Sequence, residues 1–381
     1  MPRLPAPHVG DRLKIKQRPV HFSYWPSRPV RGHHALQSTL FALDPWIIVS
    51  RFIEQNCPEP ARPEAIACLE QSKDFFVTGT ERSIIAARPL ALYYSYMNLA
   101  KAFCLTRGTR ATFDQAQHGL SEKIKQGGKE LDDAYLEAHP SFRTSNSANN
   151  FAEFIIALNG KPILSKSIFK LRDIIPQILS GHRLWSQATK QRERFISFHD
   201  IQFWHNTDRN EIWLKLYIVA DDLSRLSITQ KAFLSEAGLD VEFRSVTCEE
   251  QFQDRQLVCF EQIQPIRFNG NHPADHLKLL IDMIKPHLWV TVSTTPPYRR
   301  YYAYMCPPND RLSIMPQLAS IYAITYYLGS ITRYRPHQYD TIARGPLGPR
   351  IQDFVTGQPY QFLYLLASEI ASQEVSRPSI I

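Results

Sequence analysis

The sequence lacks the short motifs that mark several common enzyme classes. It contains no Walker loop, no GxGxxG, no GxSxG and no HExxH. These motifs place a phosphate-binding loop, a nucleophile or a pair of zinc ligands at fixed spacings. Their absence disfavours a P-loop nucleotide hydrolase, a serine hydrolase and a zincin.

Cysteine is scarce and follows no recognisable pattern. The chain has six cysteines, none of them in a CxxC pair, and Cys104 falls in a strongly apolar segment. Structural zinc sites and disulfide frameworks of small domains show closely spaced cysteines. We therefore expect reduced thiols, no metal site and no cofactor, as is usual in the cytoplasm.

Long hydrophobic runs are also missing. No stretch approaches the roughly 20 apolar residues that a membrane-spanning helix needs. The first residues, MPRLPAPHVGDRLKIKQRP, have no apolar core of the kind found in signal peptides. These two absences predict a cytoplasmic protein with no membrane partner.

Acidic residues are fewer than basic ones. There are 36 Asp and Glu against 44 Lys and Arg, which gives a net charge of +8 and a pI near 9.1. This excess favours an anionic partner such as nucleic acid, although an ordinary basic globular protein fits it equally well. With 381 residues, 44% of them hydrophobic, the chain can form two or three domains.

The most informative segment that is present runs from Leu90 to Leu120, and it begins with an apolar helix that Pro89 opens. Its apolar residues recur at helical spacing and form two faces: Leu92, Tyr96, Leu99 and Phe103 on one, and Tyr93, Met97, Ala100 and Cys104 on the other. A helix that is apolar nearly all round lies at the centre of a bundle. Gly108 can take the left-handed conformation that ends such a helix. Arg110 and His118 follow directly, beside this rigid element.

The pattern divides the chain into four regions. Residues 1–140 are expected to form an N-terminal helical region, with helices in HHALQSTLFALDPW, SEKIKQ and KELDDAYLEAH after a proline-rich arm. A Ser- and Asn-rich stretch at 139–150 is the best linker candidate. We then expect a helical connection over 151–194, an inserted α/β sheet region over 195–310, and C-terminal helices over 311–381 that complete the helical body.

The middle region changes from helical to strand periodicity. FISFHDIQFWHN and EIWLKLYIV are aromatic and β-branched runs separated by TDRN, which predicts a hairpin. SITQKAFLSEAGL predicts a helix capped by Ser227 or Thr229 and ended by Gly238. Further strands are expected in DVEFRSVT, in QLVCFEQI and in HLWVTVSTTPPYRRYYAYM. Helices return in MPQLASIYAITYYLGSITRY and PYQFLYLLASEI.

Four segments together resemble the YaaC-like family of bacterial proteins. They are YYSYMNLAKAF, the HGL that follows it, LGSITRYRP and QFLYLLAS. At a greater distance, residues Leu90 to Leu120 are similar to the helical core of HEPN domains, in which a tyrosine-rich helix precedes a basic turn and a histidine. The resemblance implies an α+β fold with a mainly helical, HEPN-like body and an inserted small antiparallel or mixed sheet.

The same resemblance implies a link to RNA. Many HEPN proteins are ribonucleases in toxin–antitoxin, abortive-infection and antiphage systems, and the catalytic ones carry Arg, four to six residues, and then His. Here seven residues separate Arg110 from His118 and ten separate Arg107 from His118. Neither spacing fits the family pattern.

Arg107, Arg110 and His118 are the candidate catalytic residues, with Tyr93 or Asn98 nearby. A histidine can transfer protons near neutral pH, and arginine can stabilise the charge of a phosphorane-like transition state. RNA cleavage without metal needs little more, because the 2′-hydroxyl supplies the nucleophile. The structural alternative is that the arginines cap a helix C-terminus and that His118 begins the next element.

Two basic and aromatic clusters are candidate nucleic-acid-binding sites. Arg333, Arg335 and His337 surround Tyr334 at an expected helix end, where they could bind phosphates and stack on bases. The same cations could simply neutralise that helix end. Arg299 and Arg300 alternate with tyrosines on an expected strand, which also fits a half-buried edge strand with solvated arginines.

These observations lead to a hypothesis about function. We expect a nucleic-acid-linked bacterial defence or stress protein, and, if it is an enzyme, a metal-independent endoribonuclease that prefers RNA to DNA. The segments around His118 and Arg333 would then share one positively charged groove. The competing hypothesis is a non-catalytic adaptor or structural subunit of a multiprotein defence complex, with a protein partner or a second copy of the chain.

Overall fold

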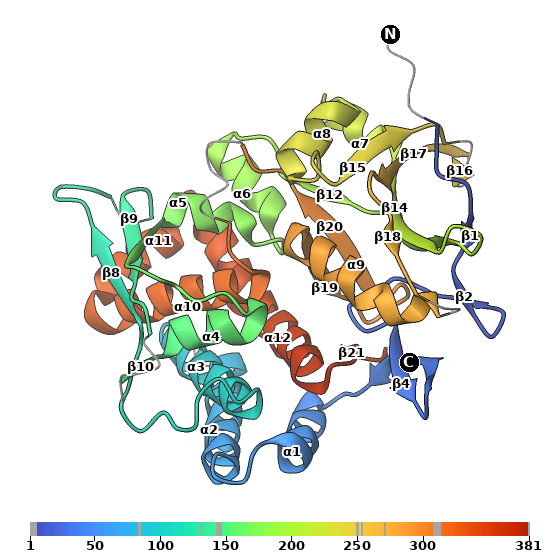
Figure 1. Cartoon of the computed structure of the whole chain (residues 1–381). Helices are drawn as coiled ribbons and strands as arrows, with labels where there is room; N and C mark the ends of the chain where they lie inside the picture. Colours follow the sequence, from blue (N-terminus) through green and yellow to red (C-terminus); the bar gives the residue numbers. More distant parts are fainter. Residues whose placement is uncertain are drawn as a thin grey trace. The chain divides into compact units, whose positions relative to one another are not determined.

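The computed structural model (Figure 1) describes residues 6–82, 85–129, 131–141, 147–248, 251–252, 254–269, 272–307 and 314–379. The chain folds into two compact units. Described residues 6–41, 192–307 and 379 belong to the first unit, and residues 42–191 and 314–378 to the second. The expected region 1–140 is therefore shared between the two units, since its first 41 residues group with the middle of the chain.

The first unit is built on an antiparallel sheet in the order β1-β13-β14-β17-β15, with β16 added to β17 and β18 to β14. The strand bounds are β1 Asp11–Arg12, β13 Asp200–Asn206, β14 Glu211–Val219, β15 Phe243–Val246, β16 Gln251–Phe252, β17 Arg255–Gln262 and β18 Ile266–Arg267. The hairpin expected around TDRN is the β13–β14 pair, so this prediction is confirmed.

Period-two alternation gives this sheet two different faces. Ile201 pairs with Leu216 and Phe203 with Leu214, and all four side chains enter the main hydrophobic core. The intervening positions carry polar and aromatic groups, among them Lys215. Alternating side chains point to opposite sides of a strand. One face therefore forms the core, and the other is free to hold charged groups.

Short helices and smaller sheets complete the first unit. Helices α8 and α9 contribute Phe233, Leu234, Leu277, Leu280, Ile281 and Ile284 to the core. The bounds are α7 Ala220–Arg225, α8 Gln230–Ala237, α9 Leu277–Ile284, β2 Lys14–Ile15, β3 Arg18–Pro19, β4 Ser27–Val30, β5 His33–Leu36, β6 Leu40–Phe41, β12 Phe195–Ser197, β19 Leu288–Val292 and β20 Arg299–Tyr304, with 3-10 turns η2 Pro273–His276 and η3 Lys285–His287.

Local capping in this unit follows the sequence. The side chain of Thr229 accepts a hydrogen bond from the backbone of Ala232 at the start of α8, and Gly238 ends that helix with a φ of +73°. Of the two caps considered, the structure uses Thr229. The strands expected on either side of Pro296-Pro297 are β19 and β20, so this prediction is confirmed.

The second unit is organised around four long helices of 18 to 24 residues. Its helices are α1 Pro45–Asn56, α2 Arg62–Thr80, α3 Arg88–Thr106, α4 Asn150–Asn159, α5 Leu171–Ile174, α6 His182–Thr189, α10 Gln317–Tyr334, α11 Pro336–Arg344 and α12 Gly348–Ala371, with the 3-10 turn η1 Ile175–Gln177. Nearly every residue of α3 is buried, as its all-round apolar sequence predicts. Gly108 follows it with a φ of +68°. The buried central helix is therefore confirmed.

Helices α3, α10 and α12 pack through aromatic rings. Tyr96 of α3 stacks on Phe362 of α12 with ring centroids 4.0 Å apart, and Tyr93 lies edge-on to Tyr326 of α10 at 5.2 Å. A Cβ at Gly329 of α10 would lie 3.0 Å from the Cβ of Tyr93. A glycine at this position lets α10 lie against α3.

Strands also occur in the second unit, which the sequence did not predict. They are β7 Ala116–Gln117, β8 Leu120–Ile124, β9 Ala134–Ala138, β10 Ala148–Asn149, β11 Ser167–Lys170 and β21 Val375–Ser376. β8, β9 and β11 form an antiparallel sheet, and β7 pairs with β10 in parallel. The helices expected in SEKIKQ and KELDDAYLEAH are wrong, because these segments form β8 and β9.

The expectation of a mainly helical, HEPN-like body with one inserted sheet is also wrong. The fold contains 44% helix and 23% strand, in several small sheets. The segment HHALQSTLFALDPW, expected to be helical, contributes β5 and β6 before α1 begins at Pro45. In β9 the buried residues Ala134, Leu136 and Ala138 alternate with less buried ones, although each is a good helix former. Tertiary contacts have here overridden helix propensity.

Membrane-spanning helices were searched for in the described part of the chain. None of the helices found there combines the length and the apolar character needed to cross a bilayer.

Candidate functional site

His118 lies on a tight connection in the second unit. It follows β7 and precedes Gly119, which has a φ of +75°, and β8 then begins at Leu120. A Cβ at Gly119 would lie 2.9 Å from the Cβ of Asn149 and 3.2 Å from the backbone nitrogen of Phe151. Only glycine combines this backbone angle with so close an approach. The connection therefore presses His118 against the beginning of α4.

Tyr93 holds the imidazole of His118. The Tyr93 hydroxyl and His118 Nδ1 are 2.6 Å apart, and the two rings are 5.6 Å apart. Tyr93 is 4% exposed and belongs to the rigid helix α3, whereas His118 is exposed. The hydrogen bond thus ties Nδ1 of His118 to the protein core, and Nε2 is the ring nitrogen that this bond does not use.

Burial and two cations lower the pKa of His118. Partial burial is the largest cause, followed by the charges of Lys101 and Arg333. His118 is therefore mainly neutral at pH 7, because its usual pKa is 6.5. Burial raises the pKa of Tyr93, so the phenol keeps its proton.

The Tyr93 hydroxyl can serve both protonation states of His118. It can donate to Nδ1 of a neutral ring, or it can accept from Nδ1–H and direct its own proton to the sulfur of Met97, 3.6 Å away. When a neutral ring carries its proton on Nδ1, as in the second arrangement, Nε2 is unprotonated and able to take a proton. Tyr93 then needs no rearrangement when the ring becomes charged.

His118 opens onto a pocket of about 470 Å³. The pocket lies between α3, the β7–β8 connection and the start of α4, and its lining consists of Met97, Lys101, Ala116, Gln117, His118, Gly119, Leu120, Ser121, His139, Asn149 and Asn150. These described lining residues include one lysine and two histidines but no carboxylate. Such a pocket favours an anionic ligand.

Arg110 and Arg107 bind protein groups rather than line this pocket. Arg110 forms an ion pair with Glu153 of α4 (Nε to Oε1, 2.7 Å) and donates to the hydroxyl of Ser141 at 3.0 Å. Glu153 is 2% exposed, so its carboxylate is buried, whereas Arg110 is only partly buried. Arg107 donates to the carbonyl oxygen of Glu369 near the end of α12 at 2.6 Å. Arg110 thus secures the helix that forms one wall of the pocket.

The three residues at the end of α10 have separate surroundings. Arg333 donates to the hydroxyl of Tyr94 at 3.1 Å, and its charge also acts on His118. Arg335 lies 3.7 Å from Glu122 of β8, and His337 is exposed on α11. The two distant segments named in the sequence therefore lie in one unit, and the charge of Arg333 contributes to the lowered pKa of His118.

Arg299 and Arg300 belong to the other unit. Both lie on β20, where Arg299 is opposite Val292 and Arg300 is opposite Thr291. Arg299 is 8% exposed, whereas Arg300 is exposed. The alternative of an edge strand with both arginines solvated is met only at Arg300, because β20 is the central strand of the β12-β20-β19 sheet and Arg299 is buried.

Sequence reasoning missed Lys101, His139 and Asn150 as pocket residues. Lys101 is a polar residue on the apolar helix α3, and it lines the same pocket as His118. His139 follows β9, a segment that the sequence predicted to be helical. The Nε2 atom of His139 is 3.2 Å from the hydroxyl of Ser121. Asn150 belonged to an expected linker. No short motif joins these positions, because they come from three separate elements.

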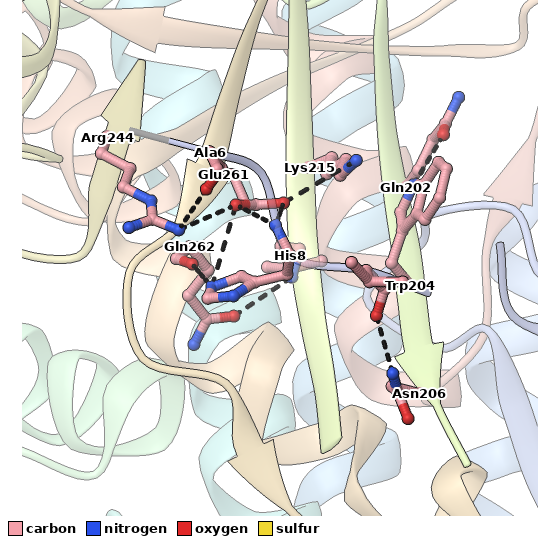
Figure 2. Close-up of polar contacts among 11 residues, drawn as sticks. Ala6, His8, Gln202, Trp204, Asn206, Lys215, Arg244, Glu261 and Gln262 are labelled. Carbon is pink, nitrogen blue, oxygen red and sulfur yellow. Dashed lines mark hydrogen bonds and ion pairs between the residues drawn. The ribbon is translucent and has the colours of Figure 1, made fainter. Parts of the chain in front are cut away.

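A second cluster of ionisable groups surrounds Glu261 in the first unit. Figure 2 shows Arg244, Lys215 and His8 converging on this carboxylate. Glu261 is fully buried, accepts from the backbone N–H of His8 at 2.9 Å, and lies 3.2 Å from Arg244 and 3.7 Å from Lys215. The His8 ring packs edge-on to Trp213. These contacts fix the N-terminal segment to the polar face of the sheet.

Among the described residues, no group of three or more His, Cys, Asp or Glu side chains is placed to hold a metal ion.

The sequence model for the YaaC-like protein family matches residues 49–370. The chain therefore belongs to the YaaC-like family, which confirms that part of the resemblance. No curated protein and no solved structure matches the chain.

Proposed function

We propose that the His118 pocket binds a phosphodiester of RNA and that His118 transfers the proton in metal-independent cleavage of that bond. The protein would act in this way in a nucleic-acid-linked defence or stress response. The arrangement that supports the proposal most directly is the 2.6 Å contact between Tyr93 and His118 inside a pocket that carries Lys101.

The chemistry requires only groups that lie in this pocket and in the RNA itself. His118 Nε2 takes the proton of the ribose 2′-hydroxyl, the 2′-oxygen attacks phosphorus, and the bond from phosphorus to the 5′-oxygen breaks. His139, in protonated form, gives a proton to the departing 5′-oxygen. Lys101 stabilises the additional negative charge on the phosphoryl oxygens in the transition state. The products are a 2′,3′-cyclic phosphate and a 5′-hydroxyl.

Cleavage of labelled RNA by the purified full chain tests this proposal. The reaction is followed with EDTA present, for the wild-type protein and for His118→Gln, which keeps a polar side chain of similar reach. General acid–base catalysis contributes about 10²–10⁴-fold, so the cleavage rate should fall by at least about 10². His33→Gln is the matched control, because His33 is exposed on β5 of the other unit.

The control should cleave at the wild-type rate. If His118→Gln cleaves RNA as fast as the wild-type protein, or if the wild-type protein cleaves no RNA at all, the proposal is wrong. A His118→Gln variant that binds RNA but no longer cleaves it would separate the catalytic role from binding.

A second candidate function, a non-catalytic adaptor, is favoured by a different observation. Leu43 and Ile47, at the beginning of α1, are 53% and 66% exposed. Ile47 also borders a pocket of about 500 Å³ between α1 and α2. Exposed apolar side chains beside a hollow are typical of surfaces that bind other proteins. Light scattering that shows an obligate complex, together with no cleavage of RNA or DNA, would favour this function.

A further inference from the structure

Helix α4 begins at the wall of the His118 pocket. Asn149 and Asn150 both line the pocket, and the backbone N–H of Phe151 donates to the carbonyl oxygen of His118 at 3.3 Å. The first N–H groups of a helix have no intrahelical acceptors and carry a partial positive charge. His118, the residue proposed to transfer the proton, therefore lies beside the N-terminus of α4.

This helix begins without a side-chain cap. Asn149 occupies the capping position but makes no capping hydrogen bond. Its amide nitrogen donates instead to the carbonyl oxygen of Pro140 at 2.6 Å. Most of the described helices likewise begin without such a bond, and Asp44 of α1 and Thr229 of α8 are the exceptions. The end of α4 that faces the pocket therefore has no side-chain cap, although the N–H groups of Asn149 and Phe151 are paired with Ser141 and with the carbonyl oxygen of His118.

Asn150 supplies an independent indication of a ligand. It is 3% exposed and lines the pocket, and its Oδ1 is buried without a hydrogen-bond donor among the described residues. A buried acceptor left unpaired is unfavourable, so native structures usually provide a donor. A ligand that carries a hydroxyl group could provide that donor here.

The charges around the helix start favour an anion. Lys101 and two histidines line the pocket, and the described lining contains no carboxylate. The nearest acidic residue on α4, Glu153, is paired with Arg110 at 2.7 Å. Its negative charge is therefore balanced by an arginine outside the pocket lining.

We infer that the pocket binds a ribonucleoside phosphate, with the phosphate at the N-terminus of α4 beside Lys101 and a ribose hydroxyl on Asn150. This inference deepens the proposed function and rests on it for the role of the pocket. It names Asn150 as the residue that distinguishes ribose from deoxyribose. The phosphate is held by Lys101 and by the partial positive charge of the helix N-terminus.

Calorimetric titration of the full chain with nucleotides that cannot be cleaved tests this inference. The probes are inorganic phosphate, adenosine 3′-monophosphate and 2′-deoxyadenosine 3′-monophosphate. The ribonucleotide should bind about tenfold more tightly than the deoxyribonucleotide, the effect of one additional hydrogen bond to a buried acceptor. Asn150→Ala should reduce this ratio to about one while changing the affinity for the deoxyribonucleotide little.

Gln352→Ala is the matched control, because Gln352 is an exposed amide side chain on α12 of the same unit and does not line the pocket. It should retain the tenfold ratio. Equal affinities of the wild-type protein for the two nucleotides, or no binding of either, would overturn the inference without any variant. A ratio that survives in folded Asn150→Ala would also overturn it.

The proposed function can fail separately from this inference. If the ribonucleotide preference depends on Asn150 but RNA is not cleaved, the pocket binds ribonucleoside phosphates and is not a nuclease site. If RNA is cleaved in a His118-dependent manner but the two nucleotides bind equally, the catalytic proposal stands and the assignment of Asn150 is wrong.

Discussion

Replacing Gly119 with alanine tests whether the pocket depends on the close approach of the β7–β8 connection to α4. The substitution has two costs. The backbone φ of +75° disfavours any residue with a Cβ, at about 1 kcal/mol. The added Cβ would also lie 2.9 Å from the Cβ of Asn149 and 3.1 Å from its carbonyl carbon. Overpacking of this kind costs about 1–3 kcal/mol.

Gly127→Ala separates these two costs. Gly127 has a similar φ of +70°, but a Cβ there would meet nothing within 4 Å. We therefore expect Gly127→Ala to lose about 1 kcal/mol and Gly119→Ala about 2–4 kcal/mol of unfolding free energy. Urea unfolding followed by far-UV circular dichroism measures both. Equal losses would refute the claim that Gly119 is required for the contact with α4.

Three further predictions concern the charged groups. Arg110→Met should lower the unfolding free energy by about 3–5 kcal/mol in urea titrations, because it leaves the buried carboxylate of Glu153 unpaired; a loss below about 1 kcal/mol would contradict the pairing. Glu261→Gln should cost a similar amount, about 3–5 kcal/mol, since Lys215 would remain buried without its counter-ion, and an unchanged urea midpoint would argue against this cluster. The affinity for sulfate, whose own charge does not change in this pH range, should rise as pH falls, because protonation of His118 adds a positive charge, and should keep rising below pH 6.5 because the pKa is lowered; calorimetry that shows a flat pH profile would exclude this role.

The sequence predicted elements whose signals are local. The all-round apolar pattern of α3, the turn between β13 and β14, and the Thr229 and Gly238 ends of α8 all depend on residues close together in the chain. Each pattern has one favourable local structure, so tertiary contacts reinforce it.

The prediction of secondary structure from the sequence was wrong where the strands are short and their residues favour a helix. β8 and β9 contain Leu, Glu, Lys and Ala, which are good helix formers. Their pairing with each other and with β11 decides the conformation, and the pairing of β11 joins residues about 30 positions apart. No local pattern contains that information.

The candidate site was only partly predictable. His118 was identified because it follows the apolar helix, and Arg110 because it lies between them. The structure pairs Arg110 with the buried carboxylate of Glu153, a partner 43 residues away. Lys101 and His139 come from different elements, so only the fold brings them to the same pocket.

The most direct test of the account is a measurement of the His118 pKa by NMR with and without adenosine 3′-monophosphate. The imidazole signal is assigned by its loss in His118→Gln. We predict a pKa below 6.5 in the free protein and a higher pKa in the complex, because a bound phosphate stabilises the protonated ring. A His118 pKa that does not change when the nucleotide is bound would show that the phosphate does not lie beside His118.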